Sequence, residues 1–160
     1  MMRPYLPIEV GESFVSWVSR FAKLQCGLST VDFLRMFDLT QNDIRAGRDC
    51  VVEAMSELSG VPTETLRMSL PKSCGVREYE CRDELFSLEF LTRQPTRYCP
   101  HCILKDLSET QFGMEFVKGR QLWLLSPVRS CSIHSVRLEV DPDNKESPLF
   151  ADLSGHVPTA

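Results

Sequence analysis

The residues whose chemistry is easiest to read are two short Cys/His pairs. Two residues separate Cys99 from Cys102 and Cys131 from His134, and 28 residues lie between the pairs. A C-x2-C pair lets two thiolates converge on one metal ion from a tight turn, and the second pair supplies the other two corners of a tetrahedron. Because zinc in structural sites takes four nitrogen and sulfur ligands, this spacing predicts one structural zinc ion held by these four residues.

Four unrelated residues in a cysteine-rich chain are the alternative, since the sequence holds seven cysteines. The metal site is favoured, because both pairs of residues have the two-residue spacing that is typical of metal ligands. His101 lies inside the first pair, and we expect it to be exposed rather than a ligand, because Cys99 and Cys102 already orient that turn.

The other four cysteines lack such spacing. Cys74 and Cys81 could form a second metal pair with Cys26 or Cys50, but buried free thiols are the favoured interpretation. The N-terminus has no apolar signal sequence, and no run of 18 apolar residues could span a membrane. We therefore expect a cytoplasmic protein, in a compartment that keeps thiols reduced.

The predicted zinc site is structural rather than catalytic. A catalytic zinc ion keeps a position for water near a carboxylate base, whereas four protein ligands fill the coordination sphere here. The sequence contains no H-E-x-x-H, no H-x-E with a downstream P-C-x-x-C, no P-loop and no glycine-rich nucleotide fingerprint. A zinc hydrolase is thus the least supported class of function.

The formal net charge is −4, and the charged residues are distributed unevenly along the chain. Residues 93–137 hold 7 Lys/Arg against 3 Asp/Glu, whereas residues 1–92 hold 10 against 14. An acidic chain is a poor candidate for strong DNA binding on its own, because phosphate neutralisation supplies most of that affinity. The candidate phosphate contacts are Arg97, Lys118, Arg120, Arg129 and Arg137, and the candidate partner contacts, expected to be exposed, are Arg20, Lys23, Arg45 and Arg48.

Hydrophobic periodicity predicts a mainly α protein. A helix is expected over 13–25, where Ser13 is the N-cap and Gly27 ends the helix. Four more helical segments are expected, one beginning at Ser29 and the others over 40–44, 50–59 and 63–68. Residues 1–72 would form this helical domain, and residues 73–95 a connector with an amphipathic helix over 82–91.

A faint repeat links two of the expected corners at an offset of 33 residues. Gly27 and Gly60 each follow a helix and precede an apolar residue, a cap and another helix. This is the geometry of a helix-turn-helix corner, although any two helices joined by a glycine turn look similar. Residues 96–140 would form the zinc module, with mostly strand, or a short helix and a strand, before Cys131. Residues 141–160 would be a polar tail.

Two blocks of the sequence resemble the TniQ family of transposition proteins. The first is Leu6-Pro7 followed by a Glu-Ser-x-x-Ser-Trp-x-x-Arg helix from Glu12 to Arg20. The second is Arg97-Tyr-Cys-Pro-x-Cys, a tryptophan, and Cys131-x-x-His134 with Leu138. The resemblance covers about residues 4–140.

This resemblance implies a helix-turn-helix-like domain followed by a small zinc-finger or ribbon module, in a bacterial protein. It implies a non-enzymatic adaptor that links a target-recognition complex to a AAA+ ATPase regulator and a transposase. The expected partners are that ATPase, an RNA-guided effector complex, or both, with DNA held inside the complex and no membrane. A homodimer is also compatible with the sequence. A direct DNA-binding protein is the alternative function.

Overall fold

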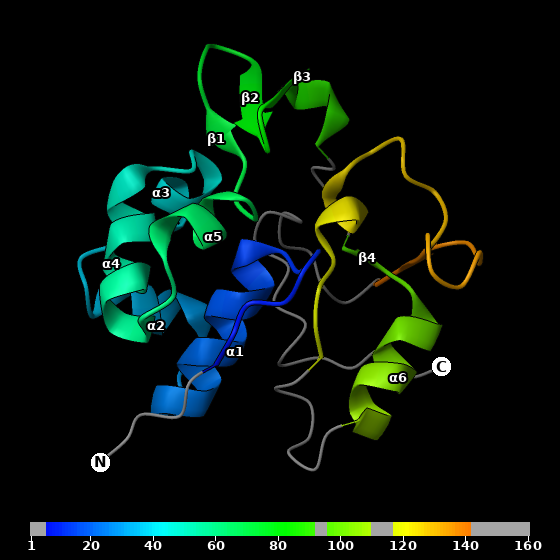
Figure 1. Cartoon of the computed structure of the whole chain (residues 1–160), viewed down its shortest axis with the longest axis horizontal. Helices are drawn as coiled ribbons and strands as arrows, with labels where there is room; N and C mark the ends of the chain where they lie inside the picture. The colour runs from blue at the N-terminus through cyan, green and yellow to red at the C-terminus, as the bar shows by residue number, and fades with distance from the viewer. Residues whose placement is uncertain (1–5, 92–95, 110–116, 142–160) are drawn as a thin grey trace.

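The computed structural model describes residues 6–91, 96–109 and 117–141 (Figure 1). Its N-terminal part is a cluster of five helices: α1 (Phe14–Cys26), α2 (Thr30–Arg35), α3 (Gln41–Arg45), α4 (Asp49–Ser59) and α5 (Thr63–Arg67). We call residues 6–71 the helical region. The five helices predicted within this region are confirmed, with bounds that differ by a few residues.

Local capping sets where these helices begin and end. The Ser13 hydroxyl accepts a hydrogen bond from the backbone N–H of Ser16, which is the N-cap role predicted for it. Thr40 and Asp43 form a reciprocal capping box at the start of α3. Gly27 and Gly60 end α1 and α4 with positive φ, a conformation that costs glycine little.

The core of the helical region forms around one face of α1. Trp17 is fully buried and its ring lies against Phe14 and Phe21, and Phe21 in turn meets Phe33 of α2 edge-on. Met55 of α4 and Leu66, which lies in α5, belong to the same buried cluster. The two glycine corners predicted from the repeat are therefore both present as helix pairs, but their architecture does not establish a helix-turn-helix that reads DNA.

The prediction of an amphipathic helix over 82–91 is wrong. This segment belongs to a three-stranded antiparallel sheet of β1 (Lys72–Ser73), β2 (Glu78–Cys81) and β3 (Glu84–Ser87), followed by the short 3-10 helix η1 (Leu88–Phe90). Phe86 stacks on Tyr79 across the β2–β3 pair, whereas Leu85 points to the other side and is exposed. The apolar residues alternate faces as in a strand, and the hairpin turn supplies the pairing that periodicity alone cannot reveal.

The remaining part, residues 96–141, is called the metal module. It contains β4 (Arg97–Tyr98), α6 (Pro100–Glu109), the 3-10 helix η3 (Gln121–Leu124) and β5 (Glu139–Val140), and β4 pairs antiparallel with β5. Before Cys131 we expected mostly strand, or a short helix and a strand; the described residues there form the 3-10 helix η3 and isolated bridges at Arg120, Leu125 and Ser130. Residues 112–116 of that predicted element lie outside the described part of the chain.

The polar tail predicted from residue 141 also falls mostly outside the described residues. Asp141 is the exception: it is buried, and its backbone N–H donates to the carbonyl of Thr96. Within the described segments, no helix has both the length and the apolar composition needed to cross a membrane. The described architecture is mainly α, with six α-helices and two small antiparallel sheets.

Candidate metal centre

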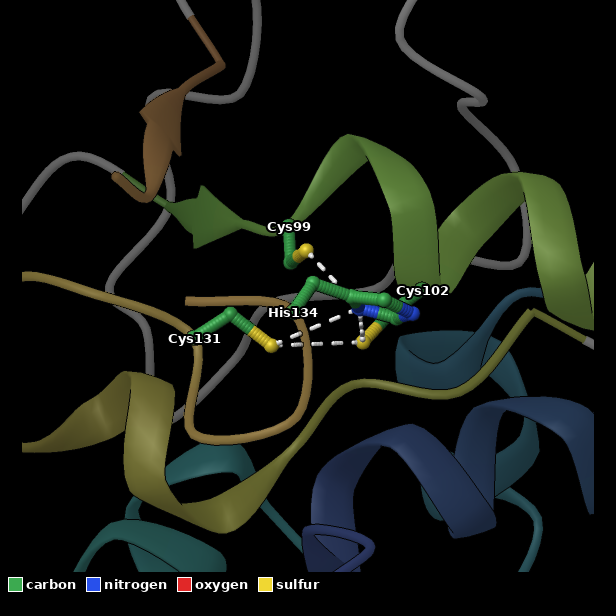
Figure 2. Close-up of side chains that lie close together, drawn as sticks. All are labelled: Cys99, Cys102, Cys131 and His134. Carbon is green, nitrogen blue, oxygen red and sulfur yellow. Dashed lines mark hydrogen bonds between the residues drawn. The ribbon is translucent and has the colours of Figure 1, made fainter. Parts of the chain in front are cut away.

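Two separate turns deliver the four predicted ligands to one place (Figure 2). Cys99 follows β4 directly, and Cys102 lies in the first turn of α6, where the N–H of Ile103 bonds to the carbonyl of Cys99. Cys131 and His134 lie on a tight turn closed by two backbone hydrogen bonds of Cys131, to Val136 and Ser135. The turn and the helix therefore face each other with their sulfur and nitrogen atoms between them.

The geometry of the cluster suits a four-coordinate metal ion. The Nδ1 atom of His134 lies 3.4 Å from the sulfur of Cys102, 3.5 Å from that of Cys99 and 3.7 Å from that of Cys131. The sulfurs of Cys102 and Cys131 are 3.6 Å apart. A tetrahedron with metal–sulfur bonds of about 2.3 Å and metal–nitrogen bonds of about 2.0 Å has edges of roughly 3.5–3.8 Å. The four residues could hold one metal ion, with Nδ1 as the histidine donor.

The electrostatics of the cluster also favour a cation. Burial and the neighbouring sulfurs of Cys131 and Cys99 raise the pKa of Cys102 to about 12. Burial opposes ionisation of Cys131 too, but the backbone N–H groups of His134 and Ile133 outweigh it and lower its pKa to about 6. Three thiolates this close repel one another unless a positive ion lies among them. The donor set therefore fits a divalent cation.

Buried apolar side chains surround the cluster, including Tyr98, Ile103, Trp123 and Leu138. His101 is exposed, as expected, and its ring lies 5.5 Å from that of His134, centroid to centroid. Three of the four candidate ligands are buried and His134 is half-buried. With four protein donors, a tetrahedral ion would have a filled coordination sphere.

The TniQ family model matches residues 4–138. The chain belongs to the TniQ family. The match spans the whole helical region, the small sheet and all four cluster residues, and the family is associated with transposition. The chain matches no curated protein and no solved structure.

The first block of the family resemblance forms the junction between the helical region and the metal module. The side chain of Arg20 donates two hydrogen bonds to the carboxylate of Glu12, at 2.8 Å and 2.7 Å. Ser16 accepts a bond of 2.7 Å from the N–H of Gly119, whose carbonyl accepts one from the N–H of Ser13. The motif therefore holds the structure together instead of presenting a surface.

This finding corrects the prediction for Arg20. The side chain is only 3% exposed, because it must reach the buried carboxylate of Glu12, and it cannot contact a partner. Sequence reasoning assigned Arg20 to the surface from its charge. Glu12 lies just before α1 and Arg20 lies within it, eight residues later. This spacing was the signal from which an ion pair between them could have been predicted.

Several candidate phosphate contacts are already engaged within the protein. Arg97 donates to the carbonyls of Trp123 and Val128, and burial together with the nearby charge of Arg129 lowers its pKa. Arg120 pairs with the buried carboxylate of Asp106 and lies over the ring of Trp123, and Lys118 pairs with Glu9. These three side chains stabilise the metal module and its junction.

The other candidate contacts differ in exposure. Arg48 is exposed and pairs with Asp43, whereas Lys23 and Arg45 are half-buried. Arg129 and Arg137 are exposed on the two chain segments beside the candidate ligands, and within the described residues neither has an ion-pair partner. These two arginines are the best placed of the nine for contacts outside the protein.

The cysteines outside the cluster were expected to be buried free thiols. They are free, but Cys26, Cys50 and Cys74 are exposed and Cys81 is half-buried, where it contacts the side-chain amide of Gln121. The expected burial is therefore wrong for three of them, because short strands and helix ends leave these positions at the surface. Within the described residues they form no second cluster with metal-binding spacing.

Proposed function

We propose that this protein is a non-enzymatic adaptor in DNA transposition, which links a target-recognition complex to a AAA+ ATPase regulator and a transposase. The observation that carries the proposal is membership of the TniQ family over residues 4–138. The RNA-guided effector of a CRISPR-associated element is one form that the target-recognition complex would take. The protein would act in the bacterial cytoplasm, where its thiols stay reduced.

The proposed ion is a single structural zinc bound by Cys99, Cys102, Cys131 and His134. Three cysteine sulfurs and one histidine nitrogen are a ligand set that structural zinc takes, and four such donors would leave no coordination position for a substrate. Its role would be to fix the turn at Cys131 against α6. The proposal of a non-enzymatic protein rests on this closed sphere and on the family.

Binding to the ATPase tests the adaptor proposal. Purified protein is immobilised and offered the AAA+ ATPase of a transposon, with ATP and without it, and retained ATPase is quantified. We expect retention by the wild type and by the exposed-histidine variant His101→Ala, and loss with His134→Ala, which removes a candidate ligand. Equal retention on an unrelated immobilised protein would contradict the proposal.

Direct DNA binding is a second candidate function, which the exposed positions of Arg129 and Arg137 favour. The bridge between Ser130 and Arg137 brings their segments side by side, so both guanidinium groups could reach one phosphate backbone. Affinity for duplex DNA should then fall steeply between about 50 and 200 mM salt, and Arg129→Ala with Arg137→Ala should reduce the salt slope by about two. A flat salt dependence would exclude this function.

A further inference from the structure

An open apolar groove lies between the three-stranded sheet and the 3-10 helix η3, away from the candidate metal ligands. Its volume is about 370 Å³, within the range of sites that bind small ligands or single side chains of a partner. Most of the groove is apolar, and its apolar lining consists mainly of Phe86, Phe90, Leu91, Leu122, Leu124 and Leu125.

The floor of this groove is packed and its rim is open. Leu91 and Leu124 are buried in a small cluster with Phe86, which stacks on Tyr79 with ring centroids 6.3 Å apart. On the rim, Phe90 is 49% exposed and Leu122 is 47% exposed. Two large apolar side chains at the mouth of one groove indicate a surface that another molecule covers.

Hydrogen bonds to the end of α5 fix the two walls of the groove. The carbonyl of Met68 accepts hydrogen bonds from Arg82 at 3.1 Å and from Gln121 at 3.0 Å, so the hairpin and η3 meet at the end of α5. Arg82 and Asp83 form the hairpin turn with positive φ, a costly conformation for residues other than glycine. The groove is thus preformed rather than dependent on a ligand.

The hairpin beside the groove carries an excess of negative charge. Four carboxylates are exposed and, among the described residues, make no ion pair: Glu78, Glu80, Asp83 and Glu84. Of the two cations on the hairpin, Arg77 pairs with Glu89 and Arg82 bonds to Met68. Glu84 itself lines the groove next to Phe86. An occupant with basic groups next to an apolar group would match this surface.

We propose that the groove binds an extended segment of a partner protein, in which an apolar side chain enters the groove and neighbouring Lys or Arg residues face the hairpin carboxylates. In the described part of the chain β3 pairs with β2 alone, so its outer edge offers backbone groups to such a segment. The acidic hairpin disfavours DNA by repulsion. It also disfavours a symmetric pair of copies, which would place two acidic hairpins together.

This inference deepens the proposed function, because it assigns a protein-binding surface to the adaptor. The test titrates isotope-labelled wild-type protein with a short peptide in which one Phe lies between Lys residues, and follows the backbone NMR signals. Two matched peptides carry Glu in place of Lys, or Ser in place of Phe. We expect shifts confined to residues 84–91 and 121–125, and binding about tenfold weaker or more for both matched peptides.

Two variants place the site. Phe90→Asp should abolish binding at the rim, and Glu84→Lys should weaken the Lys peptide and strengthen the Glu peptide. Val76→Asp is the matched control, because Val76 is fully exposed in the loop that joins β1 to β2 and does not line the groove. If Phe90→Asp does not fold, the Glu84→Lys variant still tests the proposal, because Glu84 is exposed and its charge reversal should change the preference between the Lys and Glu peptides. The proposal would be overturned if wild type bound none of the peptides, or bound all of them equally. It would also be overturned if folded groove variants bound as wild type does, or if the NMR signals that shift lay outside residues 84–91 and 121–125.

The same variants separate this inference from the adaptor function. Retention of the AAA+ ATPase by wild type and by both groove variants would overturn the groove as its docking site and leave the adaptor function standing. Peptide binding in the groove together with no retention of the ATPase by wild type would support the groove and refute the adaptor function. A dimer in analytical ultracentrifugation that dissociates in Phe90→Asp would show that a second copy fills the groove, and would overturn the proposal.

Discussion

Glu12 and Arg20 form a buried ion pair at the junction of the helical region and the metal module. Both oxygens of the Glu12 carboxylate accept from the Arg20 guanidinium, at 2.8 Å and 2.7 Å. The Ser16 hydroxyl also donates to this carboxylate while it accepts from Gly119. The pair is therefore coupled by hydrogen bonds to the backbone of the metal module.

Replacing Arg20 by Leu should destabilise the protein strongly. The change leaves the Glu12 carboxylate buried without its cation, which costs about 3–5 kcal/mol of unfolding free energy. Urea unfolding followed by circular dichroism measures the difference. Arg77→Leu is the matched control, since its pair with Glu89 is exposed and should contribute far less. Equal losses in the two variants would contradict the structural role of the buried pair.

Ser16→Ala should loosen the metal module without removing its ion. The variant leaves the N–H of Gly119 buried without an acceptor, at a cost of about 1–3 kcal/mol. Hydrogen exchange at the Gly119 amide should become faster, while metal content stays unchanged. Ser108→Ala, which changes an exposed hydroxyl of α6, should leave that exchange rate as in the wild type. Unchanged Gly119 protection in Ser16→Ala would exclude the coupling.

Removal of the metal should unfold the module around Trp123. We expect about one zinc ion per chain by elemental mass spectrometry, lost in His134→Ala and retained in His101→Ala. Because binding and folding are linked in such sites, chelation should shift tryptophan fluorescence to longer wavelength as Trp123 becomes exposed. Trp17 lies in the separate helical core and should contribute little to that shift. An unaltered fold in metal-free protein would contradict the site.

The capping box at α3 should give the helical region a dependence on acid pH. The hydroxyl and backbone N–H of Thr40, with Arg48 nearby, hold the pKa of Asp43 below its ordinary value of 3.8. The folded state therefore binds fewer protons than the unfolded state. The resulting stability is complete above that ordinary value, and is lost as the pH falls through the lower folded pKa.

Asp43→Asn removes this titration. The difference in unfolding free energy between wild type and variant should be constant near neutral pH and should shrink with acidification below about pH 4. Asp38→Asn, which changes an exposed aspartate outside the capping box, is the matched control for removal of one negative charge from the helical region. A difference between wild type and Asp43→Asn that is independent of pH would refute this role for the carboxylate.

Local patterns in the sequence determined much of this protein. The spacing of Cys99, Cys102, Cys131 and His134 predicted a cluster that the structure brings together, because each pair spans only one turn. Ser13, Gly27 and Gly60 predicted helix ends correctly, since capping depends on neighbouring backbone groups. The sequence motifs also predicted the family that the match over residues 4–138 shows.

Tertiary structure alone decided the features that depend on distant partners. The segment over 82–91 is a hairpin strand and a 3-10 turn because β3 pairs with β2 and Leu91 packs with Leu124 of η3, contacts that no local period reveals. Arg20 is buried because its guanidinium pairs with the buried carboxylate of Glu12, eight residues earlier in the chain. Charge and periodicity are properties of neighbouring residues, whereas burial and pairing are set by contacts across the chain, and these decided which residues form the surface.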